Sequence, residues 1–212
     1  MIKESEFKIA GLLCSKLCHD LISPIGAINN GLEFLKESNS DDFDDGHQII
    51  ADSAKLAAVR LGYYRLAFGR VGDNEVMKFN IVKDQIETLS RERSLEIAWV
   101  GIENHIDTMV AERVGKLLMN YVLLISEFTP RGGRAEIKLT HTTPDPNFSI
   151  KLESDKLIIK DDVLKDLQNG MKIQEVTVRN IVFFYCMTLT DLSSKVPFFD
   201  NRLPSAIILG VK

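Results

Sequence analysis

A long stripe of apolar side chains near the N-terminus constrains the fold of this chain more than any other sequence feature. If residues 4–36 form one helix that advances about 100° per residue, a set of apolar side chains falls on one face at spacings of three and four. They are Ala10, Leu13, Leu17, Leu21, Ile25, Ile28, Leu32 and Leu35. The sequence therefore predicts a long amphipathic helix. Pro24 lies inside it, where it removes one backbone donor and favours a local kink without breaking the helix.

His19 lies on the opposite side of this predicted helix, roughly half a turn from the centre of the apolar stripe. A histidine that served only to fill the core would lie on the side of Leu17 and Leu21 instead. The residues around His19 on the outer face are small or polar. They are Ser15, Lys16, Ser23, Gly26 and Asn30. We therefore expect an imidazole that the surface of another protein can reach.

The residues that follow His19 form a motif. Residues 19–24 read His-Asp-Leu-Ile-Ser-Pro. They resemble the phosphoacceptor motif of histidine-kinase dimerisation domains, in which His is followed by Glu or Asp, Leu, a basic residue, Thr or Asn, and Pro. Ile22 stands in place of the basic residue, which is the one clear departure within the motif. The longer run at residues 13–33, LCSKLCHDLISPIGAINNGLE, is similar to the ChpT family, the histidine phosphotransferases of alphaproteobacterial cell-cycle phosphorelays.

The resemblance to the ChpT family implies a function, partners and site residues. His19 would take a phosphoryl group from an aspartate of one receiver domain and pass it to an aspartate of another. The donor would be the receiver domain of a hybrid sensor kinase (CckA-like), and the acceptors would be response regulators (CtrA-like and CpdR-like). By resemblance to its kinase counterpart, Asp20 would orient or deprotonate the other ring nitrogen; the alternative is an ordinary exposed charge.

The chemistry of phosphoryl transfer limits what else such a site needs. An unperturbed histidine is mostly neutral at cytoplasmic pH, so one ring nitrogen has a free lone pair. Transfer depends on in-line geometry and charge neutralisation more than on covalent help. We therefore expect the receiver domain to bring its own Mg²⁺, and this chain to use no cofactor or metal of its own. Ser23, one turn further on, is expected to hydrogen-bond the phosphoryl group or a hydrolytic water. Lys16 is expected either to offset the phosphate charge or to be a plain solvated lysine.

Composition excludes several other classes of protein. The chain of 212 residues has a net charge of -4 and no basic stripe, so we expect no binding to nucleic acid. No apolar run reaches membrane-spanning length, and the N-terminus lacks the apolar core of a signal peptide. An apolar fraction of 45% with 26% charged residues is that of an ordinary soluble protein. We expect it in the cytoplasm.

The cysteines are Cys14, Cys18 and Cys186, too few and too badly spaced for a disulfide framework. Cys14 and Cys18 are four residues apart, which suggests a metal pair beside His19. On the helical wheel, however, Cys14 turns toward the apolar stripe and His19 turns away. We therefore expect small buried hydrophobic side chains rather than metal ligands.

A second long helix is predicted at residues 42–69, after a polar turn at residues 39–42. Its apolar side chains recur at alternating spacings of four and three, a seam typical of helical bundles. They are Ile50, Ala54, Ala57, Leu61, Tyr64 and Phe68. A hairpin of two such helices leaves much of both stripes in water, and pairing of two copies into a four-helix bundle would cover them. We therefore expect a homodimer; the alternative is a hairpin that packs on the second domain of its own chain.

The polar, glycine-containing stretch at residues 69–74 is the predicted domain boundary, because the helical periodicity stops there. It separates a helical-hairpin domain at residues 1–70 from a second domain at residues 75–212. In the second domain, helices are predicted at residues 81–93, 109–128, from Asp161 onward, and at 176–192. Strands are predicted at residues 95–100, 135–140, 148–152 and 206–211, with a turn at 142–147. Helices on one face of a mainly antiparallel sheet make an α/β sandwich, so the whole chain belongs to the α+β class.

The run at residues 117–133 resembles the helix and turn that open the ATP-binding (GHKL) domain of histidine kinases. That family has two asparagines four residues apart, the second of which holds the magnesium ion; here Asn120 matches the first and Leu124 occupies the second. The family also needs Asp-x-Gly-x-Gly after a strand, but no glycine follows Asp155 until Gly170. Triphosphate binding needs backbone donors and a held metal. The resemblance therefore implies a degenerate domain that binds no ATP and helps to hold the response regulator beside the bundle.

Two other functions stay open on the sequence alone. The chain could be the core of an ATP-dependent sensor histidine kinase, which predicts nucleotide binding and autophosphorylation. It could also be a non-catalytic module that binds a response regulator and keeps only a vestige of the phosphoacceptor motif. The missing glycines and the missing magnesium ligand disfavour the kinase.

Overall fold

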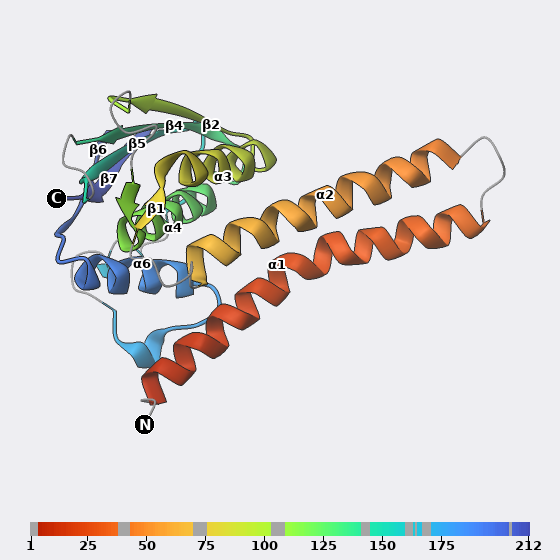
Figure 1. The fold of residues 1–212 in the computed structure, drawn as a ribbon, viewed down its shortest axis with the longest axis horizontal. Coiled ribbons are helices and arrows are strands. Elements are labelled where there is room, and N and C mark those ends of the chain that lie inside the picture. The colour runs from red at the N-terminus through yellow and green to blue at the C-terminus, as the bar shows by residue number, and fades with distance from the viewer. Residues whose placement is uncertain are drawn as a thin grey trace.

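The structure, a computed structural model, describes residues 4–37, 43–69, 76–102, 109–140, 145–159, 163, 165–166, 171–203 and 205–212. A long helical hairpin comes first, and a sheet covered by helices follows it (Figure 1). The predicted α+β class is confirmed. The stretch that was predicted to separate the two domains falls mainly on residues 70–75, outside the described ranges.

Helices α1 (Glu4–Glu37) and α2 (Phe43–Phe68) form the hairpin and lie side by side (Figure 1). As predicted, α1 continues through Pro24. The helices approach each other closely where each has a glycine. A Cβ atom on Gly31 would lie 2.7 Å from Cγ1 of Ile50, and one on Gly46 would lie 2.5 Å from Cδ2 of Leu35, so neither position has room for a larger residue without a shift of its neighbour. The predicted turn at residues 39–42 lies outside the described residues.

A single chain leaves much of the apolar surface of the hairpin uncovered. Leu61 belongs to the predicted seam of α2 and is 57% exposed, and Ile25 in the stripe of α1 is 49% exposed. Tyr64, near the C-terminal end of the seam, is buried. Among the described side chains of the hairpin, the other large apolar ones that are exposed are Phe7, Ile22, Leu32, Phe34 and Ile49. These side chains need a further layer to cover them, and the homodimer stays a prediction.

The second part of the chain alternates between strands and helices. Its elements are β1 (Val76–Lys78), α3 (Phe79–Glu92), β2 (Leu95–Val100), β3 (Met109–Ala111), α4 (Glu112–Phe128), β4 (Gly133–Leu139), β5 (Phe148–Glu153), the 3-10 helix η2 (Ile173–Glu175), α6 (Ile181–Leu192), β6 (Pro197–Leu203) and β7 (Ala206–Val211). Five strands form the main sheet in the order β2-β4-β5-β7-β6. The β2–β4 pair is parallel and the other neighbours are antiparallel. Helices α3, α4 and α6 cover one face of this sheet (Figure 1), and α4 is buried along most of its length.

Two helices begin later than predicted. Residues 109–111 are not helical, because they form β3 and pair antiparallel with β1, a partner that the local pattern does not reveal. The helix predicted at residues 176–192 begins at Ile181. Before it, the side-chain oxygen of Asn180 accepts a hydrogen bond of 2.7 Å from the backbone N–H of Thr177. This bond closes a non-helical turn between the two residues.

Besides β3, strands β1 and β6 were not predicted, and two predicted segments lie largely outside the described residues. Strand β6 has the sequence PFFDNRL, in which Pro, Asp and Asn are poor strand formers. It pairs with β7 at the edge of the sheet, and its Pro197 occupies the first position, where no ladder donor is needed. The turn at residues 142–147 and the helix from Asp161 onward are the two segments that the structure describes only in part.

Hydrogen bonds from buried side chains attach the hairpin to the second part. The Tyr63 hydroxyl donates to the carbonyl oxygen of Met119 over 2.5 Å. From α4, Nδ2 of Asn120 donates to the carbonyl oxygen of Ala67 over 3.0 Å, and Asn120 itself is fully buried. The end of α2 is therefore held against the middle of α4 by two hydrogen bonds, one donated by α2 and one donated by α4.

Replacing Asn120 with Ala should weaken this attachment. The substitution removes the donor to the buried carbonyl oxygen of Ala67, and an unpaired buried acceptor costs about 1–3 kcal/mol. We expect the free energy of unfolding, measured by urea denaturation, to fall by about this amount, and amide hydrogens at the end of α2 to exchange faster. Asn30→Ala, on the exposed surface of α1, is the matched control and should change neither. Equal stability of Asn120→Ala and wild type would refute the proposed role of this bond.

Candidate functional site

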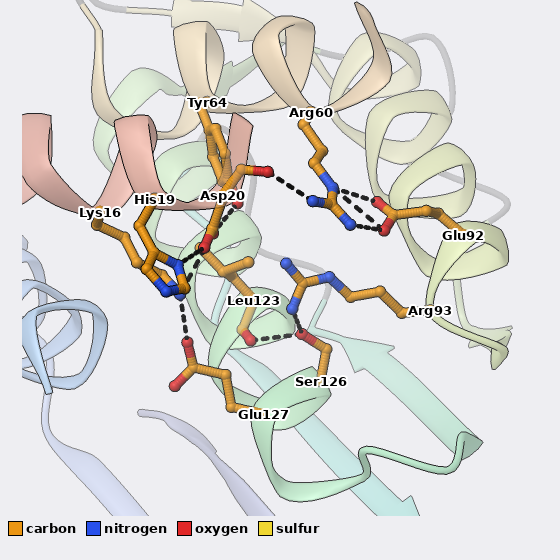
Figure 2. A network of polar contacts seen from close by, with 10 residues as sticks. All are labelled: Lys16, His19, Asp20, Arg60, Tyr64, Glu92, Arg93, Leu123, Ser126 and Glu127. Atoms are coloured by element: carbon orange, nitrogen blue, oxygen red, sulfur yellow. Dashed lines mark hydrogen bonds and ion pairs between the residues drawn. The ribbon is translucent and has the colours of Figure 1, made fainter. Parts of the chain in front are cut away.

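His19 is carried on the outside of α1, and its side chain is 77% exposed. The helix continues for more than four turns beyond it, so the backbone that carries the ring is regular on both sides. Figure 2 shows the ring standing beside the carboxylate of Asp20. The imidazole is therefore accessible from outside, as the sequence predicts.

Asp20 turns inward, unlike His19, and its side chain is 10% exposed. Its Oδ1 lies 3.2 Å from Nδ1 of His19, and its Oδ2 accepts a hydrogen bond of 2.5 Å from the hydroxyl of Tyr64. Nζ of Lys16 lies 3.2 Å from the same Oδ2. The alternative of an ordinary exposed charge at Asp20 is therefore wrong, because α2 covers this carboxylate and supplies a donor to it.

The partners of Asp20 keep its carboxylate ionised. Burial by itself raises the pKa of Asp20, but the hydrogen bond from Tyr64, the charge of Lys16 and the contact with His19 outweigh burial and bring the pKa below its ordinary value. Burial and the bond to Asp20 raise the pKa of Tyr64. At neutral pH the Tyr64 hydroxyl is therefore a donor and the Asp20 carboxylate an acceptor.

Lys16 links the phosphoacceptor helix to the second part of the chain. Its ammonium lies 3.2 Å from Oδ2 of Asp20 and 3.2 Å from Oε1 of Glu127 on α4. The sequence left open whether Lys16 offsets phosphate charge or is solvated. The alternative of a plain solvated lysine is wrong, because two carboxylates contact this side chain and only 15% of it is exposed.

The polar network extends beyond the residues that the sequence singled out. Arg60 on α2 donates to the carbonyl oxygen of Asp20 over 2.6 Å and forms an ion pair with Glu92 at the end of α3. Arg93 donates through Nη1 to the Ser126 hydroxyl over 2.8 Å. Figure 2 shows these groups gathered where α1, α2, α3 and α4 meet. Arg60 and Tyr64 are four residues apart and so share a face of α2, which is the sequence signal that could have drawn attention to them.

Ser23 lies on the exposed surface of α1, one turn after His19. Its hydroxyl has no hydrogen-bond partner among the described residues. The network of Figure 2 therefore brings together His19, Asp20 and Lys16, whereas Ser23 stands apart from it. The role predicted for Ser23 is not tested by these contacts.

The positions that would bind nucleotide in a GHKL domain are used differently here. Asn120 is buried and donates to the carbonyl oxygens of Ala67 and Lys116. Leu124 is buried where the resemblance calls for the magnesium-binding asparagine, and Asp155 is exposed. A cavity of about 460 Å³ lies beside Leu124, with Phe128 and Phe183 among its apolar walls. Carbon atoms thus occupy the place of the oxygen ligand that Mg²⁺ would need.

The expectation that Cys14 and Cys18 are buried is wrong. Both are exposed, because α1 has no neighbour on that side within one chain; Cys186, in α6, is buried. Among the described residues, no three His, Cys, Asp or Glu side chains are grouped so that they could hold a metal ion. No described helix is long and apolar enough to cross a membrane.

Comparisons with known proteins agree with the resemblance drawn from the sequence. The family described as histidine phosphotransferase C-terminal domain matches residues 81–194, more than half of the chain. Protein phosphotransferase ChpT of Brucella abortus (strain 2308) is 32% identical over 189 residues, which make up 88% of this chain and 87% of that protein. A solved structure of a bacterial phosphotransferase has a TM-score of 0.85 and 27% identity, with 100% of this chain and 98% of that chain covered. The chain therefore belongs to the histidine phosphotransferase family.

Proposed function

We propose that this chain relays a phosphoryl group between aspartates of receiver domains through a phosphohistidine at His19. The observation that carries the proposal is an exposed imidazole whose Nδ1 faces the ionised carboxylate of Asp20, which is only 10% exposed. Membership of the histidine phosphotransferase family and the similarity to a protein phosphotransferase support the same reaction.

In the proposed mechanism Asp20 sets the tautomer of His19. Its Oδ1 accepts the Nδ1–H, which leaves the lone pair on Nε2. Nε2 attacks the phosphorus of an aspartyl phosphate on a docked receiver domain. The N–P bond forms while the P–O bond to the aspartate breaks, and the aspartate leaves as a carboxylate with its electron pair. Transfer to a second receiver is the same step in reverse. Mg²⁺ bound to the receiver would neutralise the phosphoryl oxygens.

The second part of the chain is proposed to be a scaffold that binds no ATP. Leu124 fills the position of the magnesium ligand, Asn120 is engaged with backbone carbonyls, and no glycine follows Asp155 until Gly170. An ATP-dependent kinase core would need the groups that these positions lack. A non-catalytic module that binds a response regulator would not need an ionised carboxylate held against the imidazole.

We propose that the active protein is a homodimer with a four-helix bundle, and that its partners are receiver domains of a hybrid sensor kinase and of response regulators. The exposed apolar side chains of both hairpin helices support the dimer, since Leu61 and Ile25 would be covered by the same residues of a second copy. Ser23, exposed one turn after His19, is proposed to contact the phosphoryl group.

Incubation with a phosphorylated receiver domain should label the wild-type chain and leave His19→Ala unlabelled, because no other group would replace Nε2. The measurement is transfer of radioactive phosphate, followed by gel electrophoresis. His47→Ala, an exposed histidine of α2, is the matched control and should label as the wild type does. Label that persists on His19→Ala would refute His19 as the acceptor.

The same assay separates the relay from the kinase. Radioactive Mg-ATP without any receiver should leave the wild type unlabelled and should not raise its melting temperature. Labelling of His19 by ATP alone would replace the relay with the sensor kinase. Receiver binding without any labelling would favour the non-catalytic module instead.

Replacing Tyr64 with Phe should slow transfer without unfolding the hairpin. Asp20 loses a hydrogen bond that stabilises its charged form, so its pKa rises and its carboxylate is free to turn away from His19. We expect the single-turnover rate constant to fall roughly tenfold, and the loss of activity on the acid side to move to higher pH.

Nuclear magnetic resonance of the ring nitrogens of His19 distinguishes a role of Tyr64 in positioning Asp20 from a merely structural role. The tautomer with the proton on Nδ1 should be less populated in Tyr64→Phe. Tyr185→Phe, which removes a hydroxyl from α6 next to Phe68, is the matched control. An unchanged tautomer ratio and pH profile in Tyr64→Phe would show that Tyr64 does not position Asp20.

Replacing Leu61 with Asp should convert the proposed dimer into monomers, because a charge would be buried in the seam between copies. Analytical ultracentrifugation measures the change in mass. Leu192→Asp, at an exposed leucine at the end of α6, is the matched control and should stay dimeric. A wild-type chain that is already monomeric would refute the bundle.

A further inference from the structure

A polar pocket opens beside Asp20 where four helices meet. It has a volume of about 350 Å³ and adjoins the cavity beside Leu124, since Glu127 lines both. Its walls come from α1, α2, the end of α3 and the end of α4 (Figure 2). The residues that line it are Lys16, Asp20, Arg60, Glu92, Arg93, Ser126, Glu127, Thr129 and Pro130.

The three cationic side chains of this pocket differ in whether a carboxylate neutralises them. Lys16 serves the carboxylates of both Asp20 and Glu127, and Arg60 is bound in two-pronged fashion to Glu92. Arg93 differs from these two cations. Its Nη1 donates to the neutral hydroxyl of Ser126, and no carboxylate of the described residues lies within ion-pair distance of its guanidinium.

The guanidinium of Arg93 is also held in place with donors to spare. The Ser126 hydroxyl that accepts from Nη1 donates in turn to the carbonyl oxygen of Leu123 over 2.6 Å, so the hydroxyl is itself fixed. Nε of Arg93 is buried and has no hydrogen-bond partner among the described residues. Because Nε has almost no accessible surface, the donors that a docked protein could reach are the guanidinium nitrogens that line the pocket. A carboxylate has two oxygens at the spacing that a guanidinium fork binds.

We infer that Arg93 binds an acidic side chain of the receiver domain that docks on His19. The inference rests on the proposed function. The pocket shares Asp20 and Lys16 with the surroundings of His19, so a protein that presents an aspartyl phosphate to Nε2 covers the mouth of this pocket as well. Three acidic and three basic side chains line it, and their charges sum to zero. The contact therefore acts through directed hydrogen bonds at short range rather than through long-range attraction.

The test compares Arg93→Gln with Arg91→Gln, using the isolated receiver domain that accepts phosphate fastest from the wild-type chain. Arg93→Gln should weaken the Kd for the unphosphorylated receiver roughly tenfold or more, mainly through faster dissociation in surface plasmon resonance. Arg91 bonds to the carbonyl oxygen of Glu87 and does not line the pocket, so its variant makes the same change of charge and should bind as the wild type does. Equal affinities of the two variants would overturn the inference.

A second variant keeps the test decisive if Arg93→Gln fails to fold, as judged by circular dichroism. Arg93→Lys retains the positive charge but loses the planar fork, so its affinity should fall between those of wild type and Arg93→Gln. Wild-type affinity in Arg93→Lys would show that no two-pronged contact is made.

The chemistry of the ligand is tested by a double-mutant cycle. Each Asp and Glu of the receiver outside its own phosphorylation site is replaced by Asn or Gln and measured against wild type and Arg93→Gln. One receiver position should weaken binding to the wild type and have no further effect on Arg93→Gln. The inference is wrong if no position is coupled, or if inorganic phosphate alone competes with the receiver for the site.

Failure of this inference can be told apart from failure of the proposed relay. With saturating phosphorylated receiver, Arg93→Gln should still be labelled on His19 at the wild-type rate, because Arg93 acts in docking. Normal labelling with equal affinities would overturn the role of Arg93 alone. A wild-type chain that is never labelled would overturn the relay and this inference together.

Discussion

The rest of this structure depends on how the largely covered carboxylate of Asp20 is paired. An ion removed from water must find partners, and those of Asp20 come from two helices. Lys16 and His19 are supplied by α1, and Tyr64 is supplied by α2. The need to satisfy this one charge fixes the two helices against each other at the level of His19. It also explains why the imidazole faces outward, since the inward direction is taken by the neighbouring residue.

The periodicity of the sequence was sufficient to predict the long helices and most strands, because these elements depend on local patterns of apolar residues. It was not sufficient for features that depend on distant partners. Strand β3 needs β1, and the burial of Asp20 needs Tyr64, which lies 44 residues away in the chain. The spacing of apolar residues assigned Tyr64 to the seam of α2, and its ring is buried. The spacing could not predict that the Tyr64 hydroxyl donates a hydrogen bond to Asp20. Arg93 was missed for the same reason.

The second part of the chain uses its central helix, α4, for attachment to the hairpin. Asn120 donates to α2, and Glu127, at the other end of the same helix, reaches Lys16 on α1. Bonds between α4 and both hairpin helices suit the proposed relay, because its phosphate would arrive on a visiting protein and not from ATP held by the second part.

The proposed dimer and the proposed receiver contact use different sides of α1. The apolar stripe that would face a second copy lies roughly half a turn from His19. The pocket around Arg93 lies at the junction of the hairpin with α3 and α4, away from the exposed Leu32 and Ile49 toward the far end of the hairpin. Ile22 is an exception: it is 70% exposed one turn after His19, where histidine kinases have a basic residue. We therefore propose that Ile22 faces the docked receiver domain rather than the second copy of the chain.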